Sequence, residues 1–186
     1  PLGTTPGGND TDSSYTPNWR TMLVDTLGAG GNGYYVLDIT DPSIFSESNA
    51  SALARLDRTR GSTEPAPNCA IITDTAEKAA CTLAVQEDAD IGHITAKPVR
   101  DEANGMRVTQ ITRMNNNRWA VVLGNGYNSA NQRPVLIVQY LDGDRKLKLI
   151  PATQDAPGTG KAADNGLASP RVVDLNGDGR TDIVYA

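Results

Sequence analysis

The sequence predicts an all-β fold of short antiparallel strands, and three observations lead to this prediction. Its 186 residues include a single Phe but many Gly, Asn, Thr and Asp, a composition that favours strands and tight turns over a helical bundle. Short apolar stretches with strand character alternate with turn-forming residues. Two of these stretches also follow one common plan, which indicates a structural repeat. The length suffices for one sizeable domain.

The N-terminal half is expected to hold two strands and an insertion. Residues 1–18 have no periodicity and are expected to form a polar linker or loop. Strands are predicted at residues 20–27 and 34–40, with a glycine-rich turn between them. Residues of about 43–87 lose strand character. We interpret them as a mostly irregular insertion that contains a possible short helix in "SNASALARL" and a loop between two cysteines.

The C-terminal half is expected to hold a meander of four strands. Their links, "NNN", "NGYNSANQR" and "DGD", are short, which predicts antiparallel neighbours. After a polar loop, "SPRVVDL" and residues 182–186 are expected to begin another sheet. The four strands of the meander are predicted at residues 107–114, 118–124, 134–141 and 146–152.

The repeat predicts a β-propeller of four-stranded antiparallel blades. Both "RTMLVDTLGAGGNGYYVLDIT" and "RWAVVLGNGYNSANQRPVLIVQYL" contain an Arg-led apolar strand, a turn with Gly-Asn-Gly-Tyr and a second apolar strand. Successive four-stranded units are typical of propeller blades. Residues 19–186 are therefore expected to form a partial propeller that enters in mid-blade, completes one blade and ends after two strands of another. Such an arc would leave apolar blade faces exposed, so we expect it to be part of a larger protein.

Charge and hydropathy argue against several partners. The formal net charge is −5 and no run of Lys or Arg exists, which disfavours a nucleic acid or an anionic membrane surface as partner. No apolar run is long enough to span a bilayer, so no membrane span is expected.

The two cysteines, Cys69 and Cys81, allow two interpretations. Their spacing fits no zinc pattern, and the only histidine, His93, lies elsewhere and is expected to be a loop residue and not a ligand. Since an otherwise cysteine-free chain has both in one loop, we predict a disulfide, and hence folding in a periplasmic or extracellular setting. The alternative is two reduced, buried thiols.

For each of three enzyme motifs, the sequence lacks a feature that the enzyme class requires. No catalytic residue and no enzyme activity is therefore predicted. Gly28, Gly30 and Gly33 match G-x-G-x-x-G, but a strand-like stretch follows where the dinucleotide fingerprint needs a helix. "GTGK" at residues 158–161 lacks the earlier glycine of a phosphate loop, and Ala162 stands where a hydroxyl belongs. No G-x-S-x-G elbow is present.

The stretch "DLNGDGRTD" at residues 174–182 predicts a calcium site. Asp174, Asn176, Asp178 and Asp182 place oxygen atoms at positions 1, 3, 5 and 9, and the backbone carbonyl of Arg180 stands at position 7. Alternating oxygen ligands can surround a hard cation, and calcium accepts six or seven flexible ones better than magnesium does. Carboxylates this close would repel each other without a divalent ion.

Other interpretations of the acidic residues remain. The loop itself could be a solvated Asp/Gly hairpin turn without metal. It is not an EF-hand, because position 12 is Tyr185 and strands flank it. Two further acidic stretches, "EDAD" at 87–90 and "DGD" at 142–144, lack the ligand spacing and are expected to be solvated loop charges.

Four segments resemble the C-terminal β-propeller of the PilY/PilC family of type IV pilus tip-associated assembly and adhesion proteins. They are "WRTMLVDTLGAGGNGYYVLDITDP", "DADIG", "RWAVVLGNGYNS" and "NGLASPRVVDLNGDGRTDIVYA", in this order along the chain. The resemblance implies that the nine-residue loop binds calcium, with Asp174, Asn176, Asp178 and Asp182 as side-chain ligands. The insertion and the first 18 residues are not covered.

The resemblance also implies a non-enzymatic function. The family supports pilus assembly by opposing retraction, contributes to twitching motility and mediates surface or host-cell attachment, with calcium occupancy as a switch. Implied partners are type IV pilus components such as minor pilins or the pilus tip, together with host or abiotic surfaces contacted through regions absent here. The implied location is the bacterial cell surface or pilus tip, reached by export through the periplasm.

Two other classes of propeller compete with this interpretation. An integrin-like (FG-GAP) or lectin propeller would suit "VVDLNGDGRTDIVYA", but it predicts a similar calcium loop in several blades, and one is found here. A quinoprotein dehydrogenase propeller predicts adjacent cysteines and regularly spaced tryptophans. The two cysteines are not adjacent, and Trp19 and Trp119 are the only tryptophans.

Overall fold

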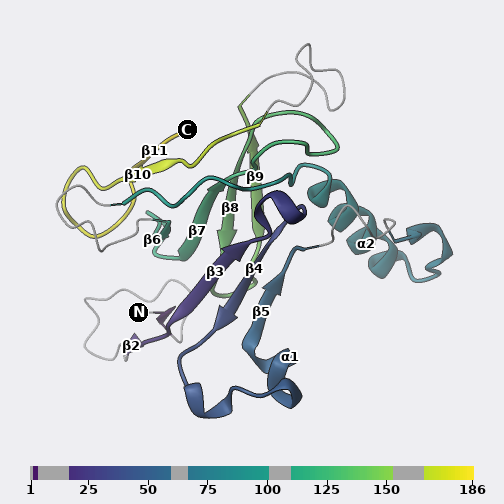
Figure 1. The fold of residues 1–186 in the computed structure, drawn as a ribbon, viewed down its shortest axis with the longest axis horizontal. Helices are drawn as coiled ribbons and strands as arrows, with labels where there is room; N and C mark the ends of the chain where they lie inside the picture. The colour runs from purple at the N-terminus through teal and green to yellow at the C-terminus, as the bar shows by residue number, and fades with distance from the viewer. Residues whose placement is uncertain (1, 4–16, 60–66, 101–109, 153–165) are drawn as a thin grey trace.

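A computed structural model describes residues 2–3, 17–59, 67–100, 110–152 and 166–186 of the chain (Figure 1). The described strands form only antiparallel sheets, which confirms the all-β class. Within the segment expected to be a linker, the short strands β1 (Leu2–Gly3) and β2 (Pro17–Asn18) pair with each other. The "GTGK" motif at 158–161 lies outside the described residues.

The first sheet contains the two expected strands and one that the sequence did not reveal. Strands β3 (Met22–Thr26) and β4 (Tyr34–Asp38) form a hairpin around the 3-10 turn η1 (Gly28–Gly30). Strand β5 (Ala54–Asp57) pairs with the far edge of β4. The expectation that residues 43–87 lack strands is therefore wrong at β5. "ARLD" has little β-propensity, and its pairing with β4 decides its conformation.

Helical segments fill most of the rest of the expected insertion. The main one, α2 (Thr75–Asp88), is capped at its N-terminus by Asp74, whose carboxylate accepts a hydrogen bond from the Glu77 amide at 2.8 Å. No residue of α2 is buried, which explains why its sequence shows no amphipathic pattern. In the described part of the chain, no helix has the length and apolar character needed to cross a membrane. The shorter helices are η2 (Pro42–Ile44), η3 (Glu47–Asn49), α1 (Ala50–Leu53) and η4 (Cys69–Ile71).

The predicted four-stranded meander is confirmed, with its strands in sequence order. The first strand begins at residue 111, and residues 107–109 of its predicted range lie outside the described part of the chain. A final antiparallel pair follows, β10 (Arg171–Val173) and β11 (Ile183–Tyr185). The meander consists of β6 (Ile111–Arg113), β7 (Trp119–Gly124), β8 (Val135–Tyr140) and β9 (Leu147–Pro151).

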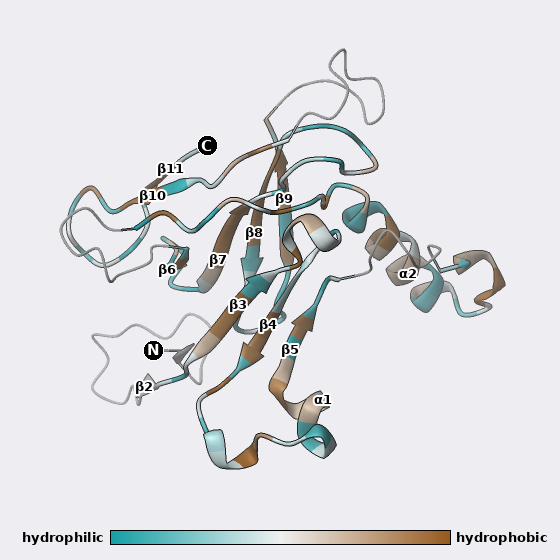
Figure 2. Ribbon diagram, viewed as in Figure 1, coloured by the Kyte–Doolittle hydropathy of each residue, from teal (hydrophilic) through white to brown (hydrophobic). Residues whose placement is uncertain are grey.

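The central strands of the meander sheet, β7 and β8, are buried on both faces, between the first sheet and the β10–β11 hairpin. Val121 and Leu123 of β7 belong to a core shared with β4, and Ala120 and Val122 belong to a second core that packs against β10 and β11. Successive residues of a strand point to opposite faces, so both faces of β7 must be apolar. Its continuous apolar run follows from this, and β7 is mostly brown in Figure 2. The stacking of sheets agrees with the predicted propeller arrangement.

One buried hydrogen bond joins the first two sheets. Tyr34 of β4 donates its hydroxyl to the Oε1 of Gln139 on β8 at 2.9 Å, and both residues are fully buried. Burial raises the pKa of Tyr34, so the hydroxyl stays protonated and available as donor. The Nε2 of Gln139 donates to the Arg145 carbonyl at 2.7 Å. The polar pair is therefore satisfied inside an apolar core.

The expectation that "EDAD" is solvated is wrong. Asp90 is 3% exposed, and Arg133 donates to both of its carboxylate oxygens at 2.8 and 2.7 Å. Arg58, at the end of β5, pairs with Glu87 and Asp88 at 2.9 and 3.0 Å, which attaches the C-terminal end of α2 to the first sheet. The sequence could not show these pairs because their partners lie 29 to 43 residues away.

The "DGD" stretch is likewise only partly solvated. The carboxylate of Asp142 accepts from the Arg118 Nε and the Trp119 amide, both at 2.9 Å. Asp144 is exposed and pairs with the same guanidinium at 2.7 Å. Arg118 also lies over the Tyr140 ring, 4.1 Å from its centroid. These contacts connect the β8–β9 turn to the start of β7.

Two glycines allow three backbone segments that are distant in sequence, at His93, Gly126 and Gly166, to cross in close contact. Gly126 has φ +70°, and a Cβ there would lie 2.0 Å from the His93 carbonyl oxygen. A Cβ at Gly166 would lie 1.5 Å from the Gly126 carbonyl oxygen. The second glycine of the repeated Gly-Asn-Gly-Tyr motif, Gly126 in this copy, is thus a position where two backbone segments are in direct contact. His93 lies in this crossing, stacked on Tyr127.

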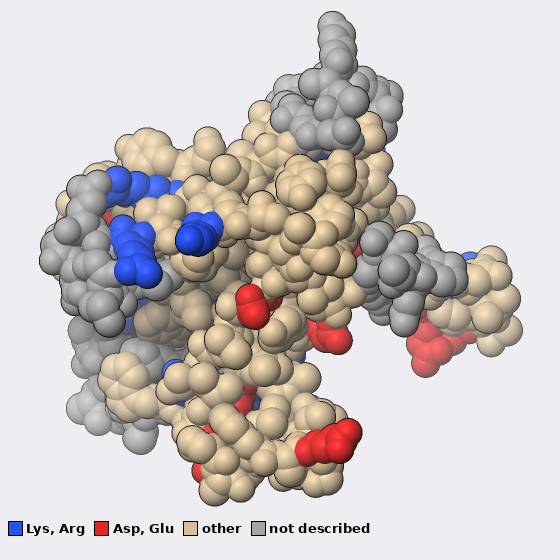
Figure 3. Space-filling view, in the orientation of Figure 1, with Lys and Arg blue, Asp and Glu red and all other residues tan. Residues whose placement is uncertain are grey.

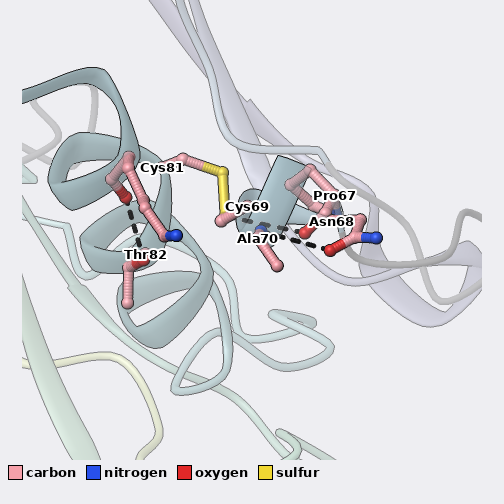
Figure 4. The surroundings of a disulfide bond; sticks show 7 residues. Pro67, Asn68, Cys69, Ala70, Cys81 and Thr82 are labelled. Carbon is pink, nitrogen blue, oxygen red and sulfur yellow. Dashed lines mark hydrogen bonds between the residues drawn. A yellow bond between two sulfur atoms is a disulfide. The ribbon is translucent and has the colours of Figure 1, made fainter. Parts of the chain in front are cut away.

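The predicted disulfide between Cys69 and Cys81 is present (Figure 4). It links η4 to the middle of α2, and the two Cα atoms are 5.7 Å apart. This disulfide arm, residues 67–88, projects from the sheets in Figure 1. It exposes apolar side chains, with Ile71 76% and Leu83 54% exposed. Because the arm has almost no core of its own, the crosslink takes over part of that role.

Tyr34→Phe is expected to lower the free energy of unfolding by about 1–3 kcal/mol, because it leaves a buried Gln139 oxygen without a donor. Chemical denaturation measures the change. The matched control is Tyr35→Phe, whose hydroxyl bonds to Asp25 on the exposed face. It should change the stability by less than about 0.5 kcal/mol. Equal effects of both variants would contradict a special role for the Tyr34–Gln139 bond.

Reduction of the disulfide is expected to loosen the arm and leave the meander intact. The crosslink closes a short loop, which is worth about 2–3 kcal/mol on a chain-entropy estimate. Hydrogen exchange should therefore speed up in α2 after reduction and stay unchanged in β7. The double variant Cys69→Ser/Cys81→Ser should show the fast α2 exchange without reductant. Unchanged α2 protection in both experiments would show that the crosslink does not support the helix.

Candidate metal centre

The acidic stretch forms the loop between β10 and β11 (Figure 1). The hairpin brings its two ends together, because Val173 pairs with Ile183 and the Asp182 amide donates to the Val173 carbonyl at 2.9 Å. Val172 and Val184 pack against the meander sheet and fix the hairpin there. Strand pairing and apolar burial on one side thus hold an exposed polar loop on the other.

Asp174 organises the first half of the loop. Its two carboxylate oxygens accept hydrogen bonds from the amides of Gly177 and Gly179, each at 2.7 Å. Both glycines have positive φ, +75° and +81°, which lets the backbone turn its amides toward the carboxylate. Nothing would contact a Cβ at either position. Glycine is therefore required here by backbone conformation and not by space.

Asn176, Asp178 and Arg180 form the outer part of the loop. Asn176 and Asp178 each accept from the amide two residues ahead, at 3.0 and 2.9 Å. The second oxygen of Asp178 pairs with the Arg180 guanidinium at 3.2 Å. The sequence suggested only a carbonyl role for Arg180, so its side chain adds a positive charge that the prediction did not include. An ion in the loop would compete with this guanidinium for Asp178.

Asp182 closes the loop. Its Oδ2 accepts from the Leu175 amide at 2.9 Å, so the last predicted ligand is connected to the residue after the first one. Asp182 is half-buried, whereas Asp174, Asn176 and Asp178 are exposed. Among the four predicted side-chain ligands, Asp182 therefore has the most restricted surroundings.

The pKa of Asp174 lies below its ordinary value. Desolvation of the carboxyl raises the pKa, but the hydrogen bonds from the Gly179 and Gly177 amides, together with smaller contributions from Asp178 and Asn176, lower it by more in total. The carboxylate is therefore ionised at neutral pH. A charged, amide-supported oxygen is what a hard cation requires of a first ligand.

The donor set fits calcium in its chemistry, although the side chains are not gathered around one point. All five predicted ligands offer hard oxygen atoms on one nine-residue loop. Within the described residues, however, no three His, Cys, Asp or Glu side chains lie so that they could hold a metal ion. The carboxylates instead accept hydrogen bonds from the loop's own amides. Ion binding would require the loop's side-chain oxygens to turn toward one common point.

One residue of the loop was missed by sequence reasoning. Thr181 is 5% exposed, and its amide donates to the Arg113 carbonyl of β6 at 2.7 Å. Its hydroxyl lies 2.6 Å from the hydroxyl of Thr112, also on β6. A Thr between charged residues gives no local sign of such contacts. Only the fold shows that the loop is joined to the edge of the meander sheet.

The remaining candidates from the sequence have structural positions. Gly28 and Gly30 lie in η1, Gly33 follows, and strand β4 comes next where a dinucleotide site would need a helix. The Nδ1 of His93 lies 3.1 Å from the Gly28 carbonyl. Figure 3 shows Lys and Arg side chains on the side of this face where β10 and β11 lie, and Asp and Glu on the disulfide arm.

Stacked antiparallel sheets with an Asp-rich loop in a strand hairpin define a piece of a β-propeller. Comparison with known proteins gives the family: residues 74–186 match the PilY1 β-propeller domain. The chain belongs to this family, and the resemblance seen in the sequence is confirmed.

Relatives agree with this assignment. The chain is 30% identical over 178 residues to a type IV pilus biogenesis factor PilY1 homolog of Xylella fastidiosa, and 29% identical to the PilY1 of Pseudomonas aeruginosa. Each alignment covers 94% of this chain but only 9% and 11% of those proteins. The crystal structure of the P. aeruginosa PilY1 C-terminal domain matches with a TM-score of 0.58 and 27% identity, over 90% of this chain and 24% of that one. The chain thus spans about a tenth of the relatives' length.

Asp174→Ala is expected to release the Gly177 and Gly179 amides, because both donate to its carboxylate. Their hydrogen exchange should become faster in calcium-free protein, while exchange in β11 stays the same. Asp182→Ala serves as the matched variant, since it should release the Leu175 amide and leave the two glycine amides slow. If either variant loosens the whole loop uniformly, the division of roles between the two carboxylates is wrong.

Proposed function

We propose that this chain is a calcium-binding, non-enzymatic part of a β-propeller that supports type IV pilus assembly, opposes pilus retraction, and contributes to twitching motility and surface attachment. Family membership supports the pilus role, since relatives are named type IV pilus biogenesis factors. The single observation that supports the metal role is the loop at 174–182. It combines three carboxylates, the side-chain amide of Asn176 and two glycines with positive φ.

The chemistry of the site rests on five residues. Side-chain oxygens of Asp174, Asn176, Asp178 and Asp182 would hold the ion, with the Arg180 carbonyl and water completing the shell. The calcium ion would supply two positive charges, which offset most of the negative charge of three neighbouring carboxylates. The chain's own part is to present Asp174 already ionised and supported by two amides. Because the ion binds the ordered loop better than the unfolded chain, it stabilises the fold.

The proposed location is the bacterial cell surface or pilus tip, reached through the periplasm. The disulfide of the arm supports it, because such crosslinks form and persist in oxidising compartments. The proposed partners are type IV pilus components, such as minor pilins or the pilus tip. Host or abiotic surfaces would be contacted through other regions of the whole protein.

Calcium titration tests the metal role. We expect one ion per chain, with a dissociation constant in the range of about 10⁻⁷ to 10⁻³ M found for sensor and extracellular sites. Asp182→Ala should weaken binding most, because this residue connects both ends of the loop. The control is Glu47→Gln, which removes an exposed carboxylate from η3 and should leave the affinity unchanged. Equal affinities of the wild type and Asp182→Ala would remove the site.

Assays in cells test the pilus role. Bacteria that carry Asp182→Ala in the whole protein should show fewer surface pili and reduced twitching. In a strain that cannot retract its pili, surface pili should return, because the proposed role opposes retraction. Wild-type piliation and twitching in the variant, with calcium binding lost, would disprove the link between the ion and the pilus.

A further inference from the structure

The metal loop also contacts strand β6 of the meander sheet, through Thr181. These contacts are additional to the strand pairing of the β10–β11 hairpin and to the hydrogen bonds within the loop. Thr181, between Arg180 and Asp182, leaves the hairpin and forms a parallel bridge with Met114. It is 5% exposed, although its neighbours in the loop are exposed or half-buried. Thr181 is therefore the buried residue of the loop, and it is buried against the meander sheet.

The backbone contact at this junction sets the direction of a predicted ligand. The Thr181 amide and the Arg180 carbonyl belong to one peptide group, and the chain has no cis peptide bonds among its described residues. In a trans peptide the N–H and C=O groups point in opposite directions. Because the Thr181 amide donates to the Arg113 carbonyl at 2.7 Å, the Arg180 carbonyl oxygen is directed away from β6.

The side-chain contact fixes the same peptide a second time. The hydroxyls of Thr181 and Thr112 lie 2.6 Å apart, and one must donate to the other. Two bonds from adjacent β6 residues, Thr112 and Arg113, thus restrict the backbone immediately before Asp182. The Asp182 amide in turn donates to the Val173 carbonyl of β10. The last two predicted ligands of the loop are therefore held by two different sheets.

We propose that Thr112 and Thr181 are positioning residues for the metal loop. Their hydrogen bond holds the Arg180 carbonyl and the Asp182 backbone in place for an ion, and a bound ion in turn braces the β10–β11 hairpin against the meander sheet. This inference rests on the proposed calcium binding. It adds that the affinity of the loop depends on a residue of β6, which lies about 70 residues earlier in the chain and outside the loop.

The experiment is a calcium titration of the purified full chain as wild type, Thr112→Val and Thr112→Ser. Loss of the hydroxyl pair in Thr112→Val should weaken calcium binding by about 2- to 10-fold, the range that one hydrogen bond contributes. Thr112→Ser keeps a hydroxyl and should bind like the wild type. Thr82→Val removes an exposed hydroxyl bond on α2 and serves as the control that leaves the affinity unchanged.

Two further measurements separate positioning from a merely structural role. Thr112→Val should reduce the rise in unfolding midpoint that calcium causes, whereas a structural role alone would lower the midpoints with and without calcium equally. In calcium-free protein the Thr181 amide should exchange faster in Thr112→Val than in Thr112→Ser. If Thr112→Val cannot be purified folded, Thr112→Val/Thr181→Val replaces the polar pair with an apolar pair and takes its place in each measurement.

The outcomes distinguish this inference from the proposed function. Wild-type protein that binds calcium, with unchanged affinity in Thr112→Val, overturns the positioning role and leaves the metal role intact. A flat titration of the wild type overturns both. Weaker binding in Thr112→Val with normal binding in Thr112→Ser supports the inference.

Discussion

The burial of the central meander strands, β7 and β8, on both faces is the constraint on which the rest of the structure depends. Strand β7 contributes Val121 and Leu123 to one core and Ala120 and Val122 to the other, so it cannot exchange its faces or slip in register without exposing both. The first sheet and the β10–β11 hairpin are each held by one of these faces. Their positions relative to each other are therefore set by the single sheet between them. The Tyr34–Gln139 hydrogen bond adds a directional polar contact to an otherwise apolar interface, so it forms only when β4 and β8 are correctly aligned.

The candidate metal loop is held in place by its packing on the meander sheet and not by its own sequence alone. A hairpin with three residues in each strand is marginal alone, and apolar contacts of Val172 and Val184 with the meander sheet hold it. The loop then supplies its own internal order through carboxylate-to-amide hydrogen bonds. Charge repulsion among its carboxylates opposes that order, and the Arg180 guanidinium offsets part of the repulsion. A divalent ion would act on a loop that is partly organised beforehand.

Local patterns predicted much of the fold, and contacts distant in sequence account for the rest. The strands β3, β4 and β7 to β9 were visible because burial requires apolar residues at regular positions. Strand β5 was missed because pairing with β4 imposes its conformation, and α2 because an exposed helix needs no apolar face. The charges of "EDAD" were misjudged since their partner arginines are remote. The five predicted ligands do share one loop, but the contact of Thr181 with β6 has no signal in neighbouring residues.

The crossing of backbones at Gly126 and Gly166 has a consequence for how such a chain can change over evolutionary time. A side chain of any size at either position would collide with a carbonyl oxygen of another segment, and no rotamer change could relieve the collision, because main-chain atoms are on both sides. Exposed loops around the crossing can accept insertions and new residue types at little cost. Divergence in this fold should therefore accumulate in arms and loops, while the glycines at the crossing stay fixed and keep distant copies of the domain superimposable.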